Sequence, residues 1–260
     1  MQTNIISSTD NKKIKKLLSV KNDSEFRKNE KLCFLEGEKL IFDTPKNLIS
    51  EIYIKNGYKN ENLNKYDNIK IYILDDKIFN KIKSTENSQG IIAIANFNNI
   101  IKIDKIGSDV LCLESVRDPG NIGTIIRTAE ASGFRYIILS KDCCDITSPK
   151  VIRSSMSSFF RINFFISDNL INDLLILKNN DFKIITTAIG DYKKYYEIDY
   201  NQKSIYIFGN EARGVSDEIK KISDDLITIP MDGEIDSLNV AISISVICFN
   251  IKKEKYEIKK

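Results

Sequence analysis

The chain of 260 residues predicts an α/β fold in two domains, and three observations support this. Short apolar segments alternate with helical segments along the chain. From residue 109 onward the apolar segments are nearly continuous, which is typical of parallel strands covered by helices on both faces. Residues 98–108 are polar and irregular, so we expect a linker there between residues 1–97 and 109–260.

Residues 1–97 predict a small α/β domain. Ile14, Leu17 and Leu18 give the first segment one apolar helical face. Apolar runs predict the strands, and helical patterns fill the gaps between them. The expected strands are 33–36, 52–54, 69–74 and 91–95, and the expected later helices are 38–42 and 75–83.

Residues 109–260 repeat the strand and helix alternation with longer units. We expect a helix over 122–132 that Gly133 closes, and a last helix from Ser237 to about Tyr256. That last helix is apolar on nearly every side, so it is buried within the protein or against a second subunit. The expected strands are 110–113, 136–139, 162–166, 183–187, 205–208 and 226–229.

The charge pattern leaves two readings open. The net charge is only +3, and the excess of basic residues lies in the first part of the chain, notably at Lys12, Lys13, Lys15 and Lys16. A weakly basic face is compatible with phosphate contacts, but a solvated helix face explains it equally well.

Histidine is absent from the sequence, which excludes His-based triads and His metal ligands. The five cysteines are odd in number and lack Cys-x-x-Cys spacing, which favours a reduced, cytoplasmic setting. A redox role for the vicinal pair Cys143-Cys144 is a weaker alternative. No apolar run of about 20 residues is present, so we expect no membrane partner. Without histidine or Cys-x-x-Cys spacing, we also expect no metal site.

Three loops between apolar runs could carry chemistry. The first, 114–134, follows a strand and opens a helix, a place where backbone N–H groups can face a polar ligand. There we expect Pro119-Gly120-Asn121 to form a turn. We also expect Arg127 to project from the helix beside this loop, toward the same opening as Asn121. Gly-x-Gly-x-x-Gly and Gly-Lys-Thr are both missing, so this is neither a dinucleotide fingerprint nor a Walker loop. A glycine turn beside a surface arginine would explain this loop alone.

The second loop runs from Ile207 to Ser216. Gly209 and Gly214 permit close backbone approach or positive φ, and Glu211 lies between them at the strand end. Open α/β sheets bind ligands at that edge. A strand-to-helix turn with solvated charges is the alternative.

The third loop, 229–239, leads into the last helix. Pro230 stops the preceding strand, and Asp236 or Ser237 is expected to cap the helix. Asn239, expected in the first helical turn, has poor helix propensity, which favours a cap or a functional role.

Together the three loops resemble the motifs of the SpoU/TrmH family of RNA ribose 2′-O-methyltransferases, within the SPOUT superfamily. The matching segments occur in order over about 150 residues. Residues 8–18, 34–37 and 88–93 also resemble the family's substrate-binding domain, an α/β fold shared with some ribosomal proteins. The matching motif segments are Asn121-x-Gly123 through Arg127-Thr-Ala, Gly209-Asn-Glu211-x-x-Gly214, and Ile229-Pro-Met231 with Ser237-Leu-Asn239.

The resemblance implies a C-terminal SPOUT-type α/β domain with a deep trefoil knot, a rare exception to normal chain topology. It also implies a homodimer, an RNA substrate and S-adenosylmethionine (AdoMet) as methyl donor. The cofactor contacts that it implies are Gly209, Ile229, Met231, Leu238 and Ala188. The catalytic residues that it implies are Arg127, Asn121, Glu211, Ser237 and Asn239.

Arg127 is the base that the resemblance implies, and an alternative is that it stays charged and stabilises the developing alkoxide. Ribosomal RNA is preferred over transfer RNA because of the extra N-terminal domain. Two other classes stay open: a non-catalytic RNA-binding protein of this fold, and a Rossmann-type methyltransferase. The second is disfavoured because the glycine loops cluster late in the chain.

Overall fold

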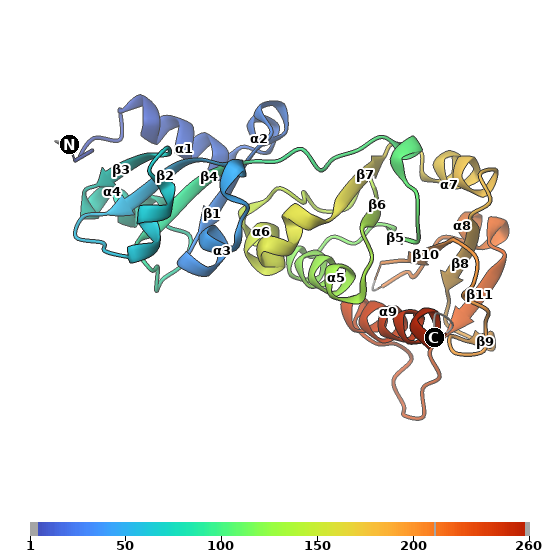
Figure 1. Ribbon diagram of the computed structural model, residues 1–260. Coiled ribbons are helices and arrows are strands. Elements are labelled where there is room, and N and C mark those ends of the chain that lie inside the picture. Colours follow the sequence, from blue (N-terminus) through green and yellow to red (C-terminus); the bar gives the residue numbers. More distant parts are fainter. Residues whose placement is uncertain (1–4, 211, 258–260) are drawn as a thin grey trace. The chain divides into compact units, whose positions relative to one another are not determined.

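The computed structural model describes residues 5–210 and 212–257. Its contacts divide the chain into two compact units, which we describe separately (Figure 1). The first unit comprises residues 1–98 and 145–160, and the second comprises residues 99–144 and 161–260. The sequence pattern groups residues 145–160 with the second domain, whereas their contacts group them with the first unit.

The first unit is built on a four-stranded sheet in the order β1-β4-β2-β3. Strand β4 is antiparallel to β1 and β2, whereas β2 and β3 are parallel. The strands are β1 (Leu32–Glu36), β2 (Ile49–Lys55), β3 (Lys70–Leu74) and β4 (Ile91–Asn96). The helices are α1 (Lys12–Asn22), α2 (Ser24–Glu30), α3 (Glu38–Asp43), α4 (Asp76–Ile82) and α6 (Pro149–Ser155), with 3₁₀ turns η1 (Lys46–Leu48), η2 (Glu61–Tyr66) and η4 (Met156–Arg161).

Helix α1 packs on this sheet through the face that the sequence predicts. Ile14, Leu17 and Val20 recur at helical spacing and are fully buried in a core shared with β2, β4 and α4. The Asn11 side chain accepts a hydrogen bond from the Lys13 N–H at 2.9 Å and so satisfies one free donor at the start of the helix.

A buried ion pair joins α2 to the segment 145–160 within the first unit. The Arg27 guanidinium donates to an Asp145 carboxylate oxygen at 2.6 Å and to the Thr147 hydroxyl at 3.2 Å. Ser24 donates to the same carboxylate at 2.8 Å. A buried guanidinium is stable only with such acceptors, so the pair fixes this segment against α2.

The second unit is built on a seven-stranded sheet in the order β7-β6-β5-β10-β8-β11-β9. All neighbouring strands are parallel. Parallel order places the carboxyl ends of all seven strands at one edge, where ligands bind in open α/β sheets. The strands are β5 (Val110–Leu113), β6 (Tyr136–Ser140), β7 (Asn163–Ser167), β8 (Lys183–Thr187), β9 (Lys193–Lys194), β10 (Ser204–Phe208) and β11 (Asp225–Thr228).

Helices cover both faces of the larger sheet (Figure 1). Val110 and Cys112 of β5 pack in a core with Leu174 of α7 (Leu170–Lys178) and Ile219 of α8 (Asp217–Ile222). Helices α5 (Pro119–Ser132) and α9 (Val240–Glu257) run side by side, joined by the Thr128 and Ser245 hydroxyls at 3.0 Å. A short 3₁₀ turn, η3 (Ile103–Lys105), precedes β5.

The structure confirms the predicted α/β class with its parallel sheet, whereas the trefoil knot stays a prediction. Two boundaries were predicted wrongly. Residues 119–121 form the first turn of α5, because the Asp118 carboxylate caps it by accepting from the Asn121 N–H at 2.8 Å. Helix α9 begins at Val240 rather than Ser237, because Asn239 caps it in place of the expected Asp236 or Ser237. No helix in the described ranges has the length and apolarity needed to cross a membrane.

Candidate active site

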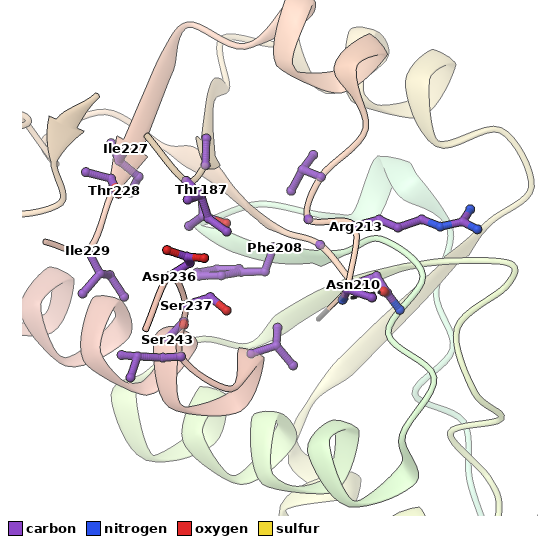
Figure 2. Close-up of a pocket in the computed structure, with 18 of the residues that line it drawn as sticks. Thr187, Phe208, Asn210, Arg213, Ile227, Thr228, Ile229, Asp236, Ser237 and Ser243 are labelled. Atoms are coloured by element: carbon purple, nitrogen blue, oxygen red, sulfur yellow. Dashed lines mark hydrogen bonds between the residues drawn. The ribbon is translucent and has the colours of Figure 1, made fainter. Parts of the chain in front are cut away.

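A pocket of about 250 Å³ opens at the carboxyl edge of the parallel sheet (Figure 2). Its walls come from residues that follow β8, β10 and β11 and from the segment before α9. All five predicted cofactor contacts and one predicted catalytic residue lie in its lining: Ala188, Gly209, Ile229, Met231 and Leu238, with Ser237.

Gly209 forms part of the pocket wall, and only glycine fits at this position. A Cβ atom at this position would lie 2.1 Å from the backbone carbon and oxygen of Gly214 and 2.4 Å from the Val215 nitrogen. Backbone atoms cannot move aside as a flexible side chain can. The bare glycine backbone therefore lines the pocket, as a ligand that contacts main-chain groups requires.

The loop after Gly209 is held by its own hydrogen bonds. The Gly214 N–H donates to the Asn210 carbonyl at 2.8 Å, and the Asn210 side chain accepts from the Ala212 N–H at 2.9 Å. The Asn210 amide also donates to the Ser115 carbonyl at 3.0 Å, which ties this loop to the one after β5. Glu211, a predicted catalytic residue, lies outside the described residues.

Asn121 and Asn239, two predicted catalytic residues from different loops, lie together. The Asn239 amide nitrogen donates to the Asn121 side-chain oxygen at 3.1 Å, and the Asn239 oxygen accepts from the Ala241 N–H at 3.0 Å. Asn239 therefore caps α9 and at the same time holds the start of α5 against it.

Arg127, like Asn121 and Asn239, is a predicted catalytic residue that does not line this pocket. It is exposed on α5, and it is not among the described residues that line the pocket. Within the described part of the chain its guanidinium makes no hydrogen bond or ion pair, so it is free to meet a ligand.

A second pocket of about 450 Å³ adjoins the first and was missed by the sequence reasoning. Asn210, Arg213 and Gly214 line both pockets. The second pocket's other lining residues include Glu114 and Asp142, each of which comes just after a strand of the parallel sheet. Acidic side chains at two strand ends were the signal that could have indicated it.

Hydrogen bonds fix the polar side chains of this second pocket. Ser115 has a positive φ of 58° and its N–H donates to the Ser140 hydroxyl at 2.8 Å. The Ser115 and Ser140 hydroxyls both donate to the Asp142 carboxylate. Burial alone would raise the pKa of Asp142, but these two hydrogen bonds, with the Arg117 guanidinium at 3.5 Å, hold it below its usual range.

Among the described residues no group of three or more His, Cys, Asp or Glu side chains is placed to hold a metal ion.

A parallel sheet with a glycine-lined pocket at its carboxyl edge defines an α/β protein that binds a small ligand there. Residues 109–249 match the SpoU rRNA Methylase family, and residues 11–93 match the MRM3-like substrate binding domain. The chain belongs to the SpoU rRNA methylase family and is an RNA methyltransferase.

Relatives of known name agree with this assignment. A protein of Synechocystis named an uncharacterized tRNA/rRNA methyltransferase is 32% identical over 186 residues, which cover 71% of this chain and 68% of that protein. RlmP of Bacillus subtilis, named a 23S rRNA (guanosine(2553)-2′-O)-methyltransferase, is 29% identical over 95% of this chain and 98% of its own length.

Solved structures share the fold along nearly the whole chain. The AdoMet-bound rRNA methyltransferase from Sinorhizobium meliloti is similar with a TM-score of 0.83 at 24% identity, covering 97% of this chain and 98% of that one. A TrmH-family RNA methyltransferase from Porphyromonas gingivalis, described as putative, has a TM-score of 0.82 at 25% identity and covers 94% and 98%.

Proposed function

We propose that this protein transfers a methyl group from AdoMet to a ribose 2′-hydroxyl of RNA, with ribosomal RNA as the substrate. The observation that carries the proposal is the glycine-lined pocket at the carboxyl ends of β8, β10 and β11, within the segment that matches the family. The two relatives named above support the RNA class, and the RlmP name supports the 2′-oxygen.

The first pocket fits AdoMet by its shape and its backbone. Gly209 leaves main-chain atoms bare at one wall, and Ile229, Met231 and Leu238 offer apolar and backbone contact on the other side, with Ala188 nearby. AdoMet supplies an electrophilic methyl group on its sulfonium. The AdoMet-bound S. meliloti structure, which has the same fold, supports this choice of methyl donor.

The attacking 2′-hydroxyl must lose its proton, and Arg127 is the group that we assign to this step. A free arginine stays protonated at pH 7, so removing its proton is costly. We therefore assign Arg127 one of two roles: the base that takes the proton, or a charged group that stabilises the alkoxide. Asn121 and Asn239, which pair at 3.1 Å, orient the start of α5, while Ser237 and Glu211 position the substrate.

The remaining parts of the proposal concern the RNA and the assembly. Residues 11–93, which match a substrate-binding domain, hold the RNA outside the methyl-transfer pocket. Ile242 and Phe249 are exposed on α9 and would be covered in a homodimer. We place this activity in the cytoplasm, in line with the five cysteines, which are all free thiols.

The test uses tritiated AdoMet and RNA from a host that lacks this gene, separated into ribosomal and transfer fractions. We expect label on a ribose 2′-oxygen of ribosomal RNA, and loss of that label in Arg127→Ala with AdoMet binding retained by calorimetry. Full activity in Arg127→Ala would refute the role of that residue. Failure of the wild type to bind AdoMet would favour a non-catalytic RNA-binding protein.

A further inference from the structure

The second pocket is lined by both acidic and basic side chains, and the transfer of a methyl group does not by itself require them. Its lining contains two carboxylates, Glu114 and Asp142, and two guanidiniums, Arg117 and Arg213. It shares a wall with the first pocket through Asn210, Arg213 and Gly214. A ligand in the second pocket would therefore lie directly beside a methyl donor in the first.

Glu114 is the carboxylate in this pocket with free acceptor capacity. One of its oxygens accepts from the Ser216 N–H at 2.8 Å, which fixes the carboxylate plane. Its other oxygen accepts no hydrogen bond from any described residue. By contrast, the Asp142 carboxylate already accepts from two serine hydroxyls and lies 3.5 Å from Arg117. Glu114 is half-buried, so its carboxylate is accessible to a ligand and less solvated than a fully exposed one.

The two arginines provide donors on the same pocket. Figure 2 shows the Arg213 side chain pointing away from Asp236 and Ser237, and so away from the interior of the first pocket. Arg213 has no hydrogen-bond or ion-pair partner among the described residues, and Arg117 is largely exposed apart from its Asp142 contact. Guanidiniums pair well with ring and carbonyl acceptors at a base edge.

We propose that the second pocket holds the base of the methylated nucleotide, that this base is guanine, and that Glu114 reads it. The proposal rests on the proposed function. An ionised carboxylate only accepts hydrogen bonds, and guanine alone offers it two adjacent donors, N1–H and the 2-amino group. The O6 and N7 acceptors of the same base face the arginines.

The other three bases fit this pocket less well. Adenine and cytosine place a ring nitrogen lone pair next to the amino group, and this lone pair repels the second carboxylate oxygen. Uracil offers one N–H between two carbonyl oxygens. The two oxygens of Glu114 together thus select for guanine, because every other base places a lone pair opposite one of them.

The experiment begins with the wild-type protein, tritiated AdoMet and total RNA from a host that lacks the gene, followed by digestion to nucleosides. We expect the label in 2′-O-methylguanosine. An RNA fragment that spans the site is then made with guanosine or inosine at the target. Inosine lacks the 2-amino group, so we expect a kcat/KM about 10-fold lower than with guanosine.

The Glu114→Gln variant links this preference to the residue. It should lose about 10-fold or more in kcat/KM on guanosine, and it should discriminate between guanosine and inosine by less than about 2-fold. Asp168→Asn, an exposed carboxylate change in the same unit, is the matched control and should keep both properties of the wild type. AdoMet affinity measured by calorimetry shows that each variant is folded.

Three results would overturn the inference. Label in another 2′-O-methylnucleoside refutes guanine but leaves the proposed function standing. Discrimination that persists in Glu114→Gln refutes Glu114 as the reader. If AdoMet binds and no RNA is labelled, the proposed function fails as well. The inosine comparison with the wild-type protein tests recognition of the 2-amino group even if Glu114→Gln does not fold.

Discussion

Replacing Arg27 with methionine tests the ion pair that attaches residues 145–160 to the first unit. The side chains of Arg27 and Asp145 are 5% and 19% exposed, and their closest atoms are 2.6 Å apart. Methionine keeps the length and apolar stem of arginine but donates no hydrogen bond. The variant therefore loses the contacts to Asp145 and Thr147 and those to the Val20 and Lys21 carbonyls, at 3.2 and 3.1 Å.

Breaking a buried ion pair by removing one partner costs about 3–5 kcal/mol. The lower end applies here, because Asp145 keeps its hydrogen bonds from Thr147 and Ser24 and retains some access to water. We expect a loss of about 3 kcal/mol in the free energy of unfolding of the first unit. At an m-value of about 1–3 kcal/mol/M, the urea midpoint falls by roughly 1–3 M.

The assay is equilibrium urea unfolding of the full chain, followed by circular dichroism, with AdoMet binding as a separate probe of the second unit. Lys28→Met, an exposed change one residue further along the same helix, is the control and should stay within about 0.5 kcal/mol of the wild type. A loss below about 1 kcal/mol in Arg27→Met, or an equal loss in both variants, would refute the reasoning.

Three further predictions follow from other contacts. Gly209→Ala should abolish AdoMet binding in calorimetry, because its Cβ would lie 2.1 Å from the Gly214 backbone; retained affinity would contradict this. Asn239→Ala should cost about 1 kcal/mol in thermal unfolding, since it removes the α9 cap; an unchanged midpoint would argue against capping. Burial alone would raise the pKa of Asp145, but hydrogen bonds from Thr147, Arg27 and Ser24 hold it below the ordinary value of ~3.9. The stability that the wild type gains over Asp145→Asn should therefore be present above about pH 4 and should fade as the pH drops through the lowered pKa in urea titrations; a difference that does not change with pH would contradict this.

The sequence predicted the strands of both sheets well because their apolar runs are bounded by turn residues. It predicted α1 from the spacing of Ile14 and Leu17, which the structure buries fully. It missed α2, whose buried residue is an arginine, because a charged side chain gives no apolar period. It also missed the two-residue strand β9, whose two exposed lysines give no apolar pattern.

The residues of the candidate site could be predicted where the loop backbone restricts which residue type can stand at a position. Gly209, Ile229, Met231 and Leu238 were chosen from loop motifs and line one pocket. The pairing of Asn121 with Asn239 could not be read from the chain, since it depends on how α5 packs beside α9. Glu114 and Asp142 were overlooked because only the parallel order of β5, β6 and β10 brings them to one edge with the Gly209 loop.

Residues 145–160 belong to the first unit but are synthesised well after the rest of it. Residues 1–98 can form their sheet early, but the Asp145 carboxylate that neutralises Arg27 is synthesised later. At about 5–20 residues per second, the 47 residues from 99 to 145 take roughly 2–9 s to synthesise. During that interval Arg27 lacks its carboxylate partner, so the first 98 residues can complete their packing only after Asp145 has been synthesised.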